Sequence, residues 1–115
     1  MDYKLLLLSS PASGREREFN DWYELHIPQL VRSSQALVGA QRFWRVNTAA
    51  LAPPYQHLVV AEFRAEDLAA SWDRHLRDFR AGVEAGALTP PPTDLFEPGS
   101  AVQWAFEPVG PHVGK

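Results

Sequence analysis

The stretch EFNDWYELHIPQL, which runs from Glu18 to Leu30, has the spacing of one helix face followed by a proline. Apolar and aromatic residues recur there at intervals of three and four, the period of an amphipathic helix. The stripe consists of Phe19, Trp22, Tyr23, His26 and Leu30. Pro28 lacks an N–H group and disfavours helical dihedral angles in the residue before it. We therefore predict a helix from Arg15 that breaks or kinks near His26 and restarts over residues 28–36.

The start of this helix carries a capping signal. Ser13 is a candidate N-cap, and Glu16 stands three residues later, where its carboxylate can reach back to the N-cap N–H group. The turn residues SSPASG come before the helix and bound a strand that we predict over Tyr3–Ser10. The sequence thus predicts a strand, a tight connection and a capped helix in succession.

Three further strands and one helix follow. Runs rich in β-forming residues predict strands over Leu37–Val46, Tyr55–Arg64 and Ala101–Val109. A second helical stripe between the last two contains Leu68, Trp72, His75, Leu76, Phe79 and Val83. The Pro-rich connections, including NTAALAPPY, are loops inside one domain that spans residues 1–115. The order β-α-β-β-α-β predicts a ferredoxin-like α+β fold, in which two helices cover one face of an antiparallel four-stranded sheet.

The predicted strands are apolar on both faces of the sheet. Leu5 and Leu7 point to one face of the first strand, and Leu6 and Leu8 point to the other. A whole second face of such residues would form an exposed patch that monomers rarely carry. We expect a second copy of the sheet to cover this face in a two-fold homodimer. The alternative is that the C-terminal segment folds over it.

Composition narrows the classes of protein. The chain has 115 residues, a formal net charge of −3 and no cysteine, which excludes disulfides and thiolate metal sites. No Lys/Arg-rich run indicates a nucleic-acid partner. The apolar run LLLL is too short for a signal peptide or a membrane span. We therefore expect a soluble cytoplasmic protein that binds neither nucleic acid nor membrane.

Four segments, EFNDWYELHIP, LVGAQRFWRV, HLVVAEF and FEPVGPHV, resemble in this order the EthD-like family of the dimeric α+β barrel superfamily. The resemblance covers nearly the whole chain and implies ferredoxin-like domains that pair sheet against sheet. It also implies a substrate cavity between the sheet and the helices, and chemistry that is cofactor-free in some relatives and haem-linked or degradative in others. The family's aromatic pair maps to Trp22 and Tyr23, and its H-x-P motif maps to His26 and Pro28. One residue fewer than in the family's usual form separates the pair from the histidine, and one residue turns a helix by about 100°.

His26 and Tyr23 are the candidate catalytic residues. The unperturbed pKa of histidine, about 6.5, suits proton transfer at neutral pH. Tyr23 lies three residues before His26 on the same helix face, where its hydroxyl could donate to a developing oxyanion. A structural interpretation stays open for both residues. The imidazole would then bond carbonyl groups freed by the helix break, and the tyrosine ring would pack in the core.

The candidate substrate-binding residues are aromatic or titratable: Trp22, Trp44, Trp72, His75, Phe79 and Glu62. If both helices cover the same face, His75 looks into one cavity with His26; otherwise its tip lies in water. Glu62 stands mid-strand among apolar residues, so it needs a partner if buried. Arg42 or Arg45 on the neighbouring strand would supply a cross-strand salt bridge. No metal site is expected, because no ligands recur at metal-binding spacing.

These features favour a cofactor-independent homodimeric enzyme that performs acid–base chemistry on a small hydrophobic, aromatic or polyketide-like substrate. The reaction would be cyclisation, dehydration or isomerisation, as in polyketide cyclases and dehydratases. Two alternatives stay open: a non-catalytic ligand-binding dimer that uses the same cavity, and a cofactor-free monooxygenase. The sequence names neither the substrate nor the reaction.

Overall fold

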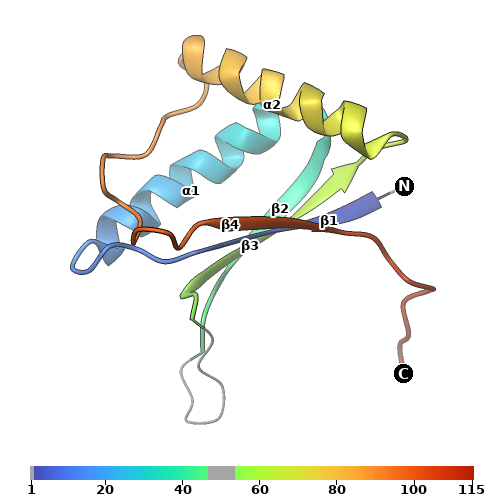
Figure 1. The fold of residues 1–115 in the computed structure, drawn as a ribbon, viewed down its shortest axis with the longest axis horizontal. Coiled ribbons are helices and arrows are strands. Elements are labelled where there is room, and N and C mark those ends of the chain that lie inside the picture. Colours follow the sequence, from blue (N-terminus) through green and yellow to red (C-terminus); the bar gives the residue numbers. More distant parts are fainter. Residues whose placement is uncertain (1, 47–53) are drawn as a thin grey trace.

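The computed structural model describes residues 2–46 and 54–115. Its elements are β1 (Asp2–Ser9), α1 (Glu16–Ser33), β2 (Leu37–Trp44), β3 (His57–Arg64), α2 (Leu68–Glu84) and β4 (Val102–Phe106). The strands form one sheet in the order β2-β3-β1-β4, and all neighbouring strands are antiparallel. Figure 1 shows both helices on the same side of this sheet. The predicted ferredoxin-like α+β fold is confirmed, and most of the predicted loop NTAALAPPY lies outside the described residues.

Helix α1 runs without interruption from Glu16 to Ser33, with Pro28 inside it. The predicted break near His26 is therefore wrong. Pro28 itself is exposed, and the helix face that packs on the sheet is buried on both sides of it: Phe19, Tyr23, His26, Ile27 and Leu30. Each large apolar side chain contributes about 1.5–3 kcal/mol on burial, whereas an interior proline costs about 3 kcal/mol. Several buried anchors thus outweigh one missing hydrogen bond.

The predicted cap of α1 is also wrong. The N-cap position is Arg15, which makes no side-chain capping bond, and not Ser13. Ser13 and Gly14 form a turn closed by a bond of 3.0 Å from the Arg15 N–H to the Ala12 carbonyl. Gly14 adopts a φ of +80°, which favours glycine. The turn therefore delays the helix by two residues, beyond the reach of the serine.

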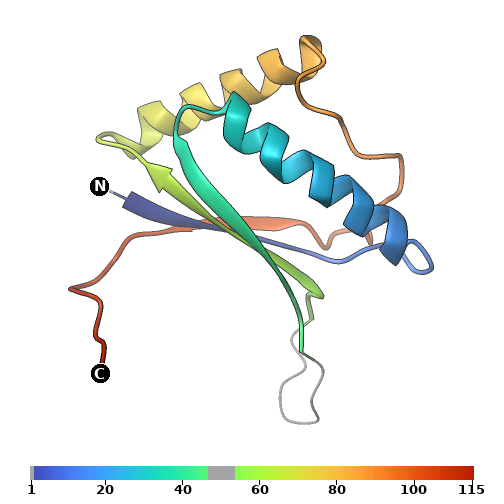
Figure 2. The same cartoon turned by 180° about the vertical axis from the view of Figure 1, so that it is seen from behind.

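The two faces of the sheet differ in what covers them. On the helix side the core is buried, including Leu5, Val59 and Phe63. The opposite face carries three rows of residues across the strands: Phe43, Leu58, Leu8 and Val102; Gln41, Val60, Leu6 and Trp104; Gly39, Glu62, Lys4 and Phe106. Figures 1 and 2 show that no helix covers this face. Residues 107–115 are exposed and do not pack over it, so the alternative of a C-terminal fold-back is wrong.

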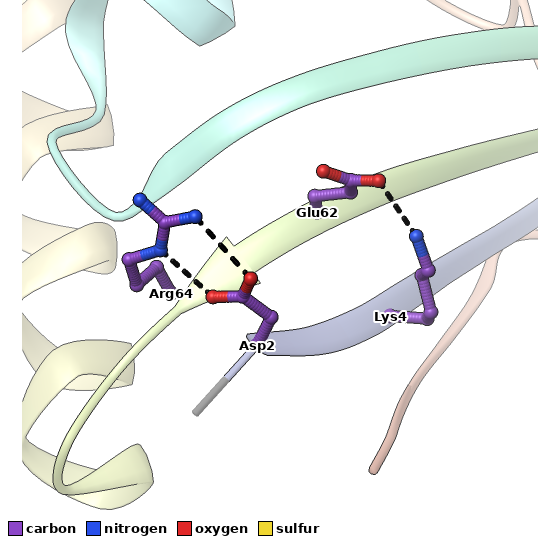
Figure 3. Close-up of polar contacts among 4 residues, drawn as sticks. All are labelled: Asp2, Lys4, Glu62 and Arg64. Atoms are coloured by element: carbon purple, nitrogen blue, oxygen red, sulfur yellow. Dashed lines mark hydrogen bonds and ion pairs between the residues drawn. The ribbon is translucent and has the colours of Figure 1, made fainter. Parts of the chain in front are cut away.

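One end of the open face is charged, as Figure 3 shows. Lys4 on β1 lies 2.7 Å from Glu62 on β3, and Asp2 lies 2.8 Å from Arg64 beside them. Glu62 is thus in a cross-strand salt bridge, but its partner is Lys4 and not the expected Arg42 or Arg45. Among the described residues, no helix is both long enough and apolar enough to cross a membrane.

Candidate functional site

A cavity of about 190 Å³ lies between the two helices and the covered face of the sheet. Four of the predicted site residues line it: His26 from α1, and Trp72, His75 and Phe79 from α2. The remaining wall is almost wholly aliphatic and consists of Leu5, Leu7, Leu30, Leu37, Ala40, Val59, Ala61, Leu76 and Gln103. Two imidazoles therefore border one apolar space.

Among the described residues, packing alone holds His26, without a hydrogen bond. Its side chain is 7 % exposed, and its ring stacks on Trp22 at a centroid distance of 4.2 Å. Its Nδ1 atom is buried without a hydrogen-bond partner among the described residues. Burial disfavours the charged imidazolium and lowers the pKa of His26 to about 4. The imidazole is therefore neutral at pH 7 and keeps an unshared lone pair in an apolar surrounding.

His75 is buried as well, so the alternative that its tip lies in water is wrong. Its Nδ1 atom lies 2.6 Å from the hydroxyl of Ser34, the C-cap residue of α1. Burial lowers the pKa of His75, and the charge of Asp78 opposes that shift. The hydroxyl contact fixes the ring between the two helices, so the orientation of His75 does not depend on a ligand.

Tyr23 lies outside the described lining of the cavity. Its hydroxyl is 3.4 Å from the hydroxyl of Ser9, and its ring packs 4.3 Å from His57 and below the guanidinium of Arg42. Burial raises the pKa of Tyr23, against the weaker opposing effects of Ser9 and Arg42. The structure places this phenol in a second polar cluster, at the other end of the covered face from α2.

His57 belongs to this second cluster. It is 1 % exposed, and its Nε2 accepts a hydrogen bond of 3.1 Å from Nε of Arg42. Burial, with a smaller effect of the Arg42 charge, lowers the pKa of His57 to about 4. Aromatic rings surround it: Phe19, Tyr23 and Trp44. His57 also lines a hollow of about 160 Å³, together with Leu8, Phe43, Trp44, Arg45, Tyr55, Gln56 and Leu58.

The other predicted wall residues are dispersed. The Trp22 ring stacks on His26, and its indole nitrogen donates a hydrogen bond of 3.0 Å to the Thr89 carbonyl. Trp44 lies at the end of β2, and Glu62 lies on the opposite face of the sheet. Sequence reasoning missed Gln103, which lines the cavity from β4. Strand alternation was the available signal, because Gln103 pairs with the inward-facing Leu7.

Within residues 2–46 and 54–115, no group of three or more histidine or acidic side chains is arranged to hold a metal ion. The cavity is an apolar pocket bordered by two imidazole rings.

Comparison with known proteins identifies the fold. No family model matches the sequence, and no curated protein is significantly similar to it. An EthD family protein from Bacillus halodurans has a solved structure with a TM-score of 0.59 and 14% identity, covering 95% of this chain and 100% of that chain. A variant of the cofactor-independent oxygenase SnoaB from Streptomyces nogalater has a solved structure with a TM-score of 0.57 and 9% identity, covering 96% of this chain and 95% of that chain.

A third similar structure is a dimeric ferredoxin-like protein of unknown function from Jannaschia sp., with a TM-score of 0.56 and 11% identity, covering 93% of this chain and 99% of that chain. At such identities the likeness establishes a shared fold. The EthD-like resemblance of the sequence agrees with these neighbours, because all of them share the ferredoxin-like α+β arrangement.

Proposed function

We propose that the protein is a cofactor-independent enzyme that abstracts a proton from a small hydrophobic carbonyl compound held in the cavity. One observation carries the proposal: a neutral, nine-tenths buried imidazole borders an apolar cavity, and its Nδ1 has no hydrogen-bond partner among the described residues. A neutral imidazole can act as a general base. A small apolar pocket with few polar groups is the kind of site that binds a small hydrophobic compound. His26 is the base in this proposal.

The low pKa of His26 is compatible with this role. Burial alone depresses it, so the proton is disfavoured only while the cavity holds no negative charge. An enolate that forms beside the ring stabilises the imidazolium by direct charge attraction in a medium of low dielectric constant. The affinity of His26 for the proton therefore rises as the substrate loses it.

In this proposal His75, and not Tyr23 as first expected, donates a hydrogen bond to the developing oxyanion. When the Ser34 hydroxyl donates to Nδ1, the ring proton sits on Nε2, and His75 can donate it to a carbonyl oxygen. The proposed step breaks a C–H bond, moves its proton to His26 and leaves the electron pair in an enolate. Return of the proton to another carbon gives isomerisation, loss of hydroxyl with the proton as water gives dehydration, and attack on a second carbonyl gives cyclisation.

A second candidate function is oxygenation without a cofactor. The aliphatic wall of the cavity favours it, and one structural neighbour is described as a cofactor-independent oxygenase. The first step is the same deprotonation, but the carbanion then gives up electrons to dioxygen. Oxygen uptake with a reduced aromatic ketone such as anthrone, measured with an oxygen electrode, separates this function from the first.

Exchange of α-protons tests the shared step directly. β-Tetralone is an aromatic ketone with acidic C–H groups, and NMR in heavy water follows their replacement by deuterium. We expect the protein to accelerate exchange and His26→Gln to reduce the acceleration by about 10²–10⁴-fold. His57→Gln is the matched control, because this histidine is equally buried but lies in the other cluster. Equal rates for wild type and His26→Gln, with both folded, would exclude His26 as the base.

We also propose that two copies pair through the open sheet face. The face exposes large apolar side chains, including Phe43 at 42% and Trp104 at 50%. An apolar area of that kind in water favours burial against a partner, and a two-fold axis makes it self-complementary. Val60→Asp, at the centre of the face, should convert the dimer to monomer in sedimentation velocity. Val113→Asp, the same change in the exposed tail, should leave it dimeric.

A further inference from the structure

The cavity beside His26 is small for a ligand site. Its volume of about 190 Å³ lies below the roughly 300–1,000 Å³ that is usual for pockets that enclose drug-sized molecules. A second hollow of about 590 Å³ lies between the start of α2 and strand β4. Its lining consists of Leu5, Leu68, Ala69, Trp72, Gln103, Trp104 and Ala105. We call this hollow the α2–β4 groove.

The groove and the cavity adjoin one another. Leu5, Trp72 and Gln103 line both of them, so these three side chains form the boundary. Trp72 comes from α2 and the other two come from neighbouring strands, β1 and β4. Together the two hollows have a volume within the usual range for ligand pockets. The two hollows therefore lie next to each other, with these three residues between them.

The two compartments differ in chemistry. The cavity is lined by the two imidazoles, whereas the groove is lined mainly by aliphatic residues and by Trp72. Trp104 also borders the groove, but its position opposite Leu6 directs its indole to the open face of the sheet. Apart from the Trp72 indole nitrogen, Gln103 is the polar side chain among the described lining residues of the groove. A compound that fills both spaces therefore has a reactive polar head at His26 and an apolar extension in the groove.

We propose that the α2–β4 groove is a second substrate subsite that binds an apolar chain or ring, with Trp72 at the junction. This inference rests on the proposed function for the identity of the head group, but the binding subsite stands apart from catalysis. The substrate class that follows is an elongated amphiphile: a phenol or carbonyl head with an alkyl or aryl tail. Substrate length is then set by the groove and not by the histidines.

The test measures binding of para-propyl-, para-pentyl- and para-heptylphenol by isothermal titration calorimetry. In the wild type, affinity should rise by roughly fourfold for each methylene that enters the groove. Ala69→Trp fills the groove from α2, so it should abolish the gain from propyl to heptyl and leave binding of para-propylphenol within about twofold. Ala70→Trp is the matched control, since it adds the same ring one residue later, at an exposed position outside the lining.

Ala105→Trp fills the same groove from β4, and it is the replacement test variant if Ala69→Trp does not fold. The proposal is overturned if the wild type binds no phenol or shows no gain with chain length, or if the control loses the gain as well. It is equally overturned if both groove-filling variants keep it. A normal chain-length effect together with unimpaired exchange in His26→Gln would remove the proposed function and leave the subsite standing.

Discussion

His26 and His57 offer a comparison between two regions of the covered face. Both are buried, both have a buried Nδ1 without a partner among the described residues, and burial lowers the pKa of each to about 4. They differ in their surroundings: Nε2 of His57 accepts from Arg42, whereas His26 has no hydrogen-bond partner among the described residues and lines the cavity between the helices and the sheet. A depressed pKa therefore reports burial, and the hydrogen bond from Arg42 distinguishes His57, whose Nε2 is occupied, from His26.

The largest expected difference between the two regions is in stability. His57→Ala removes a ring from a filled aromatic cluster and leaves the Arg42 guanidinium without its acceptor, so we expect a loss of about 3 kcal/mol in the free energy of unfolding. His26→Ala enlarges an existing cavity and loses the stacking on Trp22, at a cost of about 1 kcal/mol. Urea denaturation of both variants measures the difference. Equal costs would contradict the distinction between a filled and an open surrounding.

The dependence of stability on pH should be shared by both regions. The unfolded histidines titrate near pH 6.5, but the folded ones titrate at about pH 4, so the unfolded state binds more protons between these values. Stability is then fully present above pH 6.5 and is lost as the pH falls towards 4. Each histidine should contribute about 2 kcal/mol to the loss between pH 7 and pH 5.

Urea denaturation at pH 7 and pH 5 measures this loss of stability. His57→Gln should remove the contribution of His57, which is about 2 kcal/mol. His112 provides the control, because it is exposed in the tail and His112→Gln should leave the loss unchanged. A wild-type stability that does not vary over this interval would show that neither imidazole is neutralised by burial.

The pH dependence of kcat/KM should reflect protonation of His26 and not of His57. If His26 is the base, kcat/KM for β-tetralone exchange is level above about pH 5 and falls about tenfold per pH unit below pH 4, because protonation removes the lone pair. The profile should be the same in His57→Gln. NMR exchange rates over this range give the apparent pKa, and a value near 6.5 would mean that the ring is solvated in the working enzyme.

Much of the fold follows from local sequence pattern, and the comparison of the two histidines shows where such patterns stop. The helix period placed His26 on the buried face, and the structure agrees. The same period placed Tyr23 beside it, but its hydroxyl turns to Ser9 on β1. Which strand meets a helical side chain depends on tertiary packing, so helix spacing alone could not separate the two clusters.

Sheet register determines the salt-bridge partner of Glu62. Glu62 was expected to pair with an arginine of β2, but the residue opposite it on that strand is Gly39, beside a register shift. On the other side Glu62 lies opposite Lys4 of β1, with which it forms the salt bridge. Arg42 lies opposite Val59, three residues away along β3, and its side chain bonds His57 on the covered face, so it cannot reach Glu62. The register that sets these partners carries no clear signal in the sequence.

The smallest predicted effect concerns Pro28, two residues after His26. Because α1 continues through it, Pro28→Ala restores an N–H group that can bond the Glu24 carbonyl and removes a ring clash. Loss of the rigid proline also raises the entropy of the unfolded chain, which offsets part of the gain. We expect a net stabilisation of about 1 kcal/mol in urea denaturation and unchanged β-tetralone exchange. If the variant is instead less stable or loses activity, the proline positions the His26 imidazole, and the helix does not simply tolerate it.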